Sequence, residues 1–158
     1  KVFFSHERRG RRGKTFKLYK FQTMKNNTPN CATGELENPE QYITKFGAIL
    51  RKTSMDELPQ LWNILKGDMS FVGPRPLISS EIRAHRLRLE YGVYRFRPGL
   101  TGWAQINGRD DISLMKKMKL DKEYCDDWSL MKDLEIIIRS IKVVIKREGY
   151  QEGKFHRR

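Results

Sequence analysis

Cysteine is scarce in this 158-residue sequence, and so are the features that mark secreted or membrane-spanning chains. The two cysteines, Cys31 and Cys125, are spaced like neither a metal site nor a redox pair, so we expect no disulfide framework and a reducing compartment. No apolar run reaches the length of about 18 residues that a transmembrane helix needs, and no signal peptide is visible. The three histidines, His6, His85 and His156, lack metal-ligand spacing.

Acidic residues are too few to balance the basic ones, which leaves a net charge of +13. Residues 1–25 contain nine Lys or Arg and one Glu, and residues 139–158 contain seven Lys or Arg and two Glu. Residues 26–138 contain 16 basic and 16 acidic side chains and are neutral. Basic ends can meet anionic lipid, acidic protein or nucleic acid, or can simply be solvated. The neutral body argues against a nucleic-acid partner.

Hydrophobic residues make up 38% of the chain and are spread evenly, which predicts one compact domain over residues 1–158. We expect an α+β fold that is mostly helical, with a small sheet. The patterns predict strands over 14–24 and 69–72, turns over 10–13 and 73–76, a loop over 25–40, and helices over 42–50, 54–65, 80–91, 113–124 and 129–147. Ser79 or Ser80 could cap the third helix, whose Arg83, Arg86 and Arg88 would form a polar face.

The helix over 129–147 is predicted to be amphipathic and basic. Its apolar face carries Leu134, Ile137, Ile138, Ile141, Val144 and Ile145, opposite Lys132, Glu135, Arg139, Lys142 and Lys146. The pattern favours a helix that turns its apolar face to the core over one that lies on a membrane, although both locations fit it.

The adjacent carboxylates Asp56 and Glu57 are candidates for phosphoryl-transfer chemistry. Such a reaction needs a nucleophile, cations for the phosphate oxygens and usually a divalent metal held by carboxylates. Asp56 could attack phosphorus, and Arg51 precedes the pair. Spacing alone nevertheless favours a capping box from Ser54 to Glu57 over catalysis, in a helix that begins either there or near Pro59.

A second candidate is Arg75, which stands between Pro74 and Pro76. The flanking rings stiffen the backbone, so the guanidinium is presented with less loss of entropy on binding. A phosphate clamp and an exposed Arg in a tight turn explain this pattern equally well.

Four segments closely resemble the bacterial sugar transferases, which are monotopic polyprenyl-phosphate phosphoglycosyl transferases. They are FSHERRGRRGKTFKLYKFQTM (4–24), ITKFGAILRKTSMDELPQLWNILKGDMSFVGPRPL (43–77), RPGLTGWAQINGR (97–109) and LDKEYCDDWSLMKDLEIIIRSIKVV (120–144). The resemblance implies transfer of a sugar 1-phosphate from a UDP-sugar to a polyprenyl phosphate, commonly undecaprenyl phosphate, with release of UMP. This reaction would initiate capsule, exopolysaccharide or related glycan assembly, and the motifs leave the sugar open.

The resemblance also implies roles for individual residues. Asp56 would be the nucleophile that carries the phospho-sugar, with Mg²⁺ held by Asp56 and Glu57, and Glu57 would act as metal ligand or proton acceptor. The substrate-binding positions of the family fall on Arg51, Pro74, Arg75, Pro76, Lys20 and Asp133. Gln22 replaces an Arg of the family stretch Tyr-Lys-Phe-Arg-Thr-Met, which would weaken or retune a phosphate contact.

Family members carry an upstream re-entrant hydrophobic helix, which this sequence does not contain; because it begins at Lys1 rather than Met, we expect it to be a fragment. The resemblance places the protein on the cytoplasmic face of the bacterial inner membrane, with amphipathic helices at the surface. We expect anionic lipid beside Lys1, Arg8, Arg9, Arg11 and Arg12. The alternatives are a catalytically silent scaffold in a polysaccharide assembly complex, which the intact dyad argues against, and a basic nucleic-acid-binding module.

Overall fold

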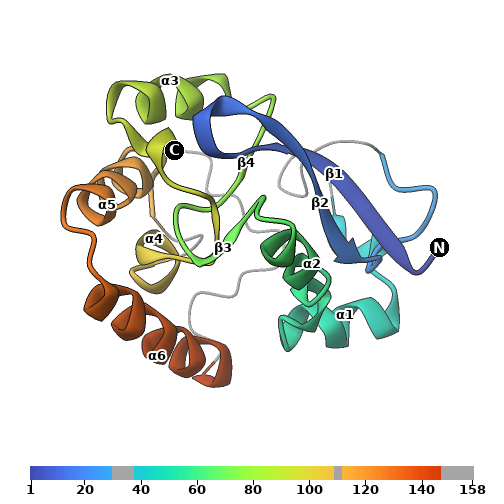
Figure 1. Ribbon diagram of the computed structural model, residues 1–158. Helices are drawn as coiled ribbons and strands as arrows, with labels where there is room; N and C mark the ends of the chain where they lie inside the picture. The colour runs from blue at the N-terminus through green and yellow to red at the C-terminus, as the bar shows by residue number, and fades with distance from the viewer. Residues whose placement is uncertain (30–37, 109–111, 147–158) are drawn as a thin grey trace.

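Figure 1 shows the computed structural model, which describes residues 1–29, 38–108 and 112–146. The strands are β1 (Phe3–Arg9), β2 (Thr15–Phe21), β3 (Ser70–Val72), β4 (Leu77–Ile78) and β5 (Gly99–Thr101). The α-helices are α1 (Lys45–Lys52), α2 (Gln60–Leu65), α3 (Ile82–Glu90), α4 (Trp103–Ile106), α5 (Leu114–Asp126) and α6 (Leu130–Lys146). Single 3₁₀ turns are η1 (Arg11–Gly13), η3 (Pro39–Tyr42), η4 (Met55–Glu57) and η5 (Val93–Arg95). The predicted α+β class is confirmed.

A long antiparallel hairpin forms one side of the molecule (Figure 1). Its register runs from Phe3↔Phe21 to Arg9↔Thr15, and β4 pairs with the other edge of β1, so the strand order is β2-β1-β4. β2 and the η1 turn confirm the predicted strand and turn. β1 was not predicted, because its charged and exposed residues hide the alternation that marks a strand.

The main hydrophobic core lies on the other side, between a two-stranded parallel sheet and the C-terminal helices. It is built from Val72, Val93, Ile106, Tyr124, Cys125 and Ile136. β3 and β5 approach so closely that a Cβ on Gly99 would lie 2.1 Å from the Gly73 nitrogen, so glycine is required there. Burial raises the pKa of the Cys125 thiol to about 12, which makes it unreactive at neutral pH.

A buried ion pair joins α3 to α5, where Arg88 Nη2 donates to Asp121 Oδ2 at 2.6 Å. The prediction that Arg88 lies on a polar surface is therefore wrong, whereas Arg83 and Arg86 are exposed as expected. A charge this deep in the protein requires a charged partner, and helical periodicity alone does not reveal a partner 33 residues away.

The helix starts differ in part from those predicted. α2 begins at Gln60, after Pro59, and Ser54 makes no capping bond because it adopts a left-handed conformation with φ of 57°. The capping box is thus wrong, and the alternative start near Pro59 is confirmed. α3 is preceded by Glu81 rather than capped by Ser79 or Ser80.

Several helices turn apolar side chains outward. On α6, Leu134, Ile137, Ile138 and Ile141 are 38–56% exposed and Ile136 alone is fully buried among the side chains described there. The favoured prediction of a core-facing apolar stripe is therefore wrong, while the side chains of Val144, Ile145 and Lys146 lie outside the described set. Two basic side chains of α6 contact the body of the protein instead: Lys132 and Arg139 lie over the Trp103 ring, at 4.8 and 5.2 Å from its centroid, whereas Lys142 is exposed.

The inward face of α2 is polar. Asn63 is fully buried; its Oδ1 accepts from the Tyr19 amide at 3.1 Å and its Nδ2 donates to the Lys17 carbonyl at 2.7 Å. These groups lie on the edge of β2 that no strand of the sheet covers. Asn63 therefore joins the helix to the hairpin, because a buried backbone group without a partner is costly.

This junction predicts that Asn63→Leu destabilises the protein by about 2–5 kcal/mol, since the substitution leaves two buried backbone groups unpaired. The measurement is the free energy of unfolding from urea titration. Trp62→Leu, an exposed change on the same helix, serves as the control and should shift the value by less than about 0.5 kcal/mol. Equal effects of the two changes would contradict the structural role given to Asn63.

Candidate active site

Two adjacent carboxylates of η4 meet a lysine of β2. Lys20 Nζ lies 2.6 Å from Glu57 Oε1 and 3.8 Å from Asp56 Oδ2, so one ammonium group faces both acids. The two segments are 36 residues apart in the chain and are brought together because α2 packs along the hairpin. The structure thus joins three of the predicted site residues.

α1 brings Arg51 to the same region. Arg51 Nε donates to Thr23 Oγ1 at 2.9 Å, and the positive charge of Arg51 is close enough to lower the pKa of Asp56. The helix approaches the end of the hairpin at Gly47, where a Cβ would lie 2.1 Å from the Thr23 carbonyl oxygen. A larger residue at position 47 would push α1, and Arg51 with it, away from the site.

The Pro-Arg-Pro turn completes the charged cluster. Arg75 Nη1 lies 3.9 Å from Glu57 Oε1, and its side chain remains 53% exposed. Three of the predicted cations, Lys20, Arg51 and Arg75, therefore act on the dyad. This concentration of positive charge beside two carboxylates suits a ligand that carries phosphate.

Asp56 is nearly buried, with 9% of its surface exposed. Burial is the largest influence on its pKa and raises it above the usual 3.8; Glu57 adds to the rise, while Lys20, Arg51 and a backbone hydrogen bond oppose it. An ionised Asp56 is thus poorly hydrated, and nearby cations rather than water compensate its charge.

Asp133 is not part of this cluster. Its carboxylate accepts hydrogen bonds from the Tyr124 hydroxyl at 2.8 Å and from the Trp128 indole at 3.3 Å, where α5 turns into α6. Figure 1 shows this turn on the opposite side of the molecule from α1 and from α2, the helix that follows η4. The described contacts of Asp133 are structural, and its predicted substrate contact stays a prediction.

Gln22 forms hydrogen bonds within its own segment of the chain. Its amide donates to the Met24 carbonyl and to Asn26 Oδ1, both at 3.0 Å. In this structure the Gln22 side chain stabilises the segment that follows β2.

Arg8 reaches the site although the sequence placed it beside lipid headgroups. Its Nη1 donates to the Pro76 carbonyl at 3.4 Å, and Glu57 and Arg75 both influence its charge. The hairpin tip with Arg11 lies beside η5, where Arg11 Nε donates to the Arg95 carbonyl at 2.9 Å. Side chains alternate between the two faces of a strand, so a predicted β1 would have placed Arg8 on the same face of the sheet as Lys20. However, β1 was not predicted from the sequence.

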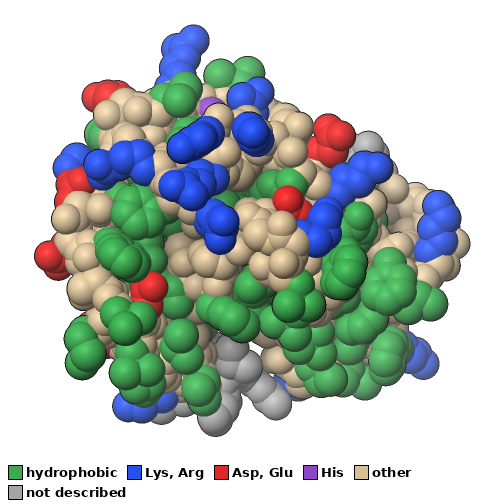
Figure 2. Space-filling view, viewed as in Figure 1, with side chains coloured by type: hydrophobic (Ala, Val, Ile, Leu, Met, Phe, Trp, Pro, Cys, Tyr) green, Lys and Arg blue, Asp and Glu red, His purple; other side chains and the backbone are tan. Residues whose placement is uncertain are grey.

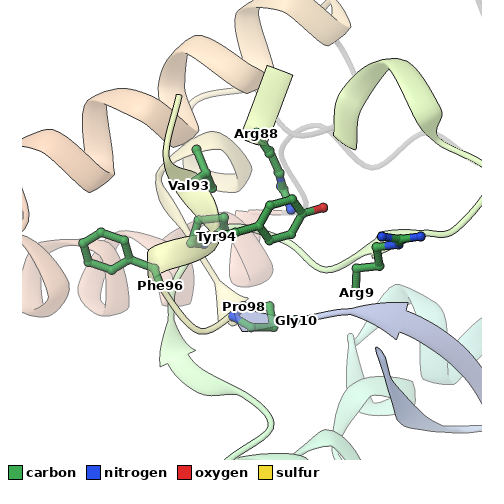
Figure 3. A pocket seen from close by; sticks show the side chains of 8 residues that line it. Arg9, Gly10, Arg88, Val93, Tyr94, Phe96 and Pro98 are labelled. Carbon is green, nitrogen blue, oxygen red and sulfur yellow. The ribbon is translucent and has the colours of Figure 1, made fainter. Parts of the chain in front are cut away.

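The Pro-Arg-Pro turn is backed by a small cavity. Figure 3 shows Tyr94 at its centre, flanked by Arg88 and Arg9, with Pro98 below. The cavity volume is about 10 Å³, enough for one water molecule at most. This cavity is therefore too small to hold a nucleotide.

Asp56 and Glu57 could provide part of the ligand set of a magnesium ion. The described residues contain no group of three or more His, Cys, Asp or Glu side chains that could form a complete metal site. Mg²⁺ is commonly held by one or two carboxylates together with substrate phosphates, and Asp56 and Glu57 provide the protein part of such a set. The Mg²⁺ prediction stays a prediction.

Comparisons with known proteins identify a family for the chain. The family model described as "Bacterial sugar transferase" matches residues 1–147. The chain is 46% identical to "Uncharacterized sugar transferase EpsL" of Bacillus subtilis, covering 96% of this chain and 73% of that protein. It is 39% identical to "UDP-galactose-lipid carrier transferase" of Erwinia amylovora and 38% identical to "Undecaprenyl-phosphate galactose phosphotransferase" of Salmonella typhimurium; it spans 34% of the length of each.

The raised pKa of Asp56 predicts a stability effect that depends on pH. Because the folded pKa exceeds the unfolded one, ionised Asp56 costs stability above the folded pKa, and this cost disappears below about 3.8. Asp56→Asn should therefore increase the free energy of unfolding at pH 7, with a gain that shrinks toward pH 4. Urea unfolding at both pH values measures it, with exposed Asp127→Asn as the control. A gain that is constant over this range would contradict the prediction.

Proposed function

Because the chain belongs to the bacterial sugar transferase family, we propose that it transfers a sugar 1-phosphate from a UDP-sugar to a polyprenyl phosphate such as undecaprenyl phosphate, releasing UMP. The observation that supports this proposal best is the Lys20–Asp56–Glu57 cluster beside Arg75. The reaction would initiate the assembly of an exopolysaccharide or capsule. The relatives whose names state a substrate support this class of reaction.

The chemistry proceeds in two displacements at one phosphorus atom. An Asp56 carboxylate oxygen attacks the β-phosphorus of the UDP-sugar, the bond from this phosphorus to the bridging oxygen breaks, and UMP leaves. A phosphate oxygen of the lipid acceptor then attacks the same phosphorus and releases the carboxylate. The product is a polyprenyl diphosphate sugar, and the enzyme is unchanged.

The neighbouring residues of Asp56 support these steps. Lys20 and Arg51 keep positive charge beside a carboxylate that burial would otherwise neutralise, so the nucleophile can be ionised. Arg75, half exposed on a stiff turn, binds and orients phosphate oxygens. Glu57, bonded to Lys20, holds the lysine in place and shares with Asp56 the role of ligand to Mg²⁺, which when bound would neutralise phosphate charge.

We further propose that the protein works on the cytoplasmic surface of the bacterial membrane, through the exposed apolar face of α1, α2 and α6. This face comprises Phe46, Ile49, Leu61, Trp62, Leu65, Leu130, Met131, Leu134, Ile137, Ile138 and Ile141, each at least 38% exposed. Figure 2 shows hydrophobic side chains covering the lower part of the molecule and most Lys and Arg above them. Apolar patches of such extent on amphipathic helices suit the boundary between headgroups and acyl chains.

This arrangement changes the expected source of membrane contact. The hairpin tip with Arg11 and Arg12 lies beside α3, at the upper side of Figure 1, whereas α1, α2 and α6 lie along the lower side. We therefore assign membrane contact to the apolar face rather than to the basic hairpin. None of the described helices is long and apolar enough to cross a membrane.

The covalent step predicts that Asp56→Ala lowers UMP release by about 10³-fold or more, because no other group can form the intermediate. UMP release is measured with undecaprenyl phosphate, Mg²⁺ and a panel of UDP-galactose, UDP-glucose, UDP-N-acetylglucosamine and modified N-acetyl sugars. Asp127→Ala, which removes an exposed carboxylate, should retain the parent rate. If the parent releases no UMP with any donor, the enzyme function fails and the scaffold alternative is favoured.

The membrane surface predicts that Leu65→Glu or Ile138→Glu weakens binding to anionic vesicles by about tenfold or more, since each removes an apolar side chain from the bilayer. Vesicle flotation measures the bound fraction. Leu89→Glu is the matched control, because Leu89 is 67% exposed but lies on α3, at the upper side of Figure 1 and away from α1, α2 and α6. An equal loss in the Leu89 variant would contradict this orientation.

A further inference from the structure

Arg8 stands on the middle strand of the three-stranded sheet, where it is opposite Phe16 of β2 and Ile78 of β4. Its side chain is half-buried and extends to the Pro-Arg-Pro turn. The one hydrogen bond described for its guanidinium is the long one to the Pro76 carbonyl, at 3.4 Å. Arg8 is thus fixed at the base of the turn that presents Arg75.

The guanidinium is held at an electrostatic cost. Burial, and next the repulsion of Arg75, lower the pKa of Arg8 to about 10, although Glu81 and Glu57 act in the opposite direction. Its Nε is buried and, within the described part of the chain, has no hydrogen-bond partner. A buried donor without an acceptor and a like-charged neighbour both disfavour the folded state.

A purely structural role does not account for this arrangement. A single long bond to a backbone carbonyl could be made by a neutral donor such as Gln, without placing a second positive charge beside Arg75. An anion that contacted the terminal N–H groups of both guanidinium groups would replace this repulsion by attraction. Phosphate oxygens have the geometry for this, because guanidinium groups bind them through paired N–H donors.

We propose that Arg8 is a substrate-binding residue which, with Arg75, holds the diphosphate of the nucleotide sugar. This inference rests on the proposed function and adds to it a residue on the hairpin. Lys20 and Arg75 both lie near Glu57 Oε1, so a diphosphate held by Arg8 and Arg75 would lie beside the dyad. The electrostatic cost of Arg8 in the free protein would be relieved when the ligand is bound.

The test measures UDP binding by isothermal titration calorimetry in the presence of Mg²⁺, together with the melting temperature of each unliganded variant. Arg8→Gln should raise the Kd for UDP by about tenfold or more, because it removes charged hydrogen bonds to phosphate. Its unliganded melting temperature should equal or exceed that of the parent, because the repulsion with Arg75 is removed. Arg8→Lys, which keeps the charge but loses the planar fork, should bind UDP with intermediate affinity.

Lys17→Gln is the matched control, since it removes one positive charge from the exposed side of the same hairpin. It should leave the Kd for UDP unchanged. An Arg8→Gln variant that binds UDP as tightly as the Lys17 variant overturns the inference, and a lower melting temperature with unchanged affinity assigns Arg8 a structural role instead. If Arg8→Gln fails to fold, unchanged affinity in Arg8→Lys is the contradicting result.

The same experiment separates this inference from the function on which it rests. A parent protein that neither binds UDP nor releases UMP overturns both. A parent that does both, alongside an Arg8→Gln variant with parental affinity, overturns only the role of Arg8.

Discussion

The hydrogen bonds of Asn63 hold the functional half of this molecule together. β2 is an edge strand, and an uncovered edge leaves backbone donors and acceptors without partners. Asn63 pairs with two of these groups, at Tyr19 and Lys17, and so attaches α2 to the hairpin. Lys20 follows directly on the strand, and Asp56 precedes the helix by a few residues. The meeting of ammonium and carboxylates therefore depends on a polar junction rather than on the hydrophobic core.

The two halves of the fold use different forces. Around α4, α5 and α6 an ordinary apolar core forms, supported by the buried pair of Arg88 and Asp121. Around α1 and α2 the buried groups include the polar Thr23, Asp56, Gln60 and Asn63 besides Leu50, and Leu61 and Leu65 point outward. Two features of the charged cluster at the boundary are unfavourable in the free protein: Asp56 is poorly hydrated, and the guanidinium groups of Arg8 and Arg75 repel each other. Such local strain is typical of sites that bind a charged ligand.

Much of this could be predicted from local patterns. Alternation indicated β2, helical spacing indicated α1, α5 and α6, and family motifs indicated the dyad with Lys20, Arg51 and Arg75. The predictions that failed were those that depend on contacts between residues far apart in the sequence. The direction in which α6 presents its apolar stripe depends on Trp103, because Lys132 and Arg139 of the opposite face lie over the Trp103 ring. The location of Arg8 depended on an unrecognised strand, and the motif did not reveal that Asp133 lies apart from the dyad and accepts a hydrogen bond from Tyr124.

The position of the dyad relative to the apolar face has a consequence for how an acceptor is found. Asp56 stands one turn before α2, whose Leu61 and Leu65 point outward. On the proposed membrane surface those leucines would rest among acyl chains, and the carboxylate would be held at the height of the lipid headgroups, where a lipid-borne phosphate also resides. Enzyme and acceptor would then differ only in their lateral positions. The search for the proposed second substrate would become diffusion in two dimensions, with a rate that depends on surface density and lipid mobility rather than on concentration in solution.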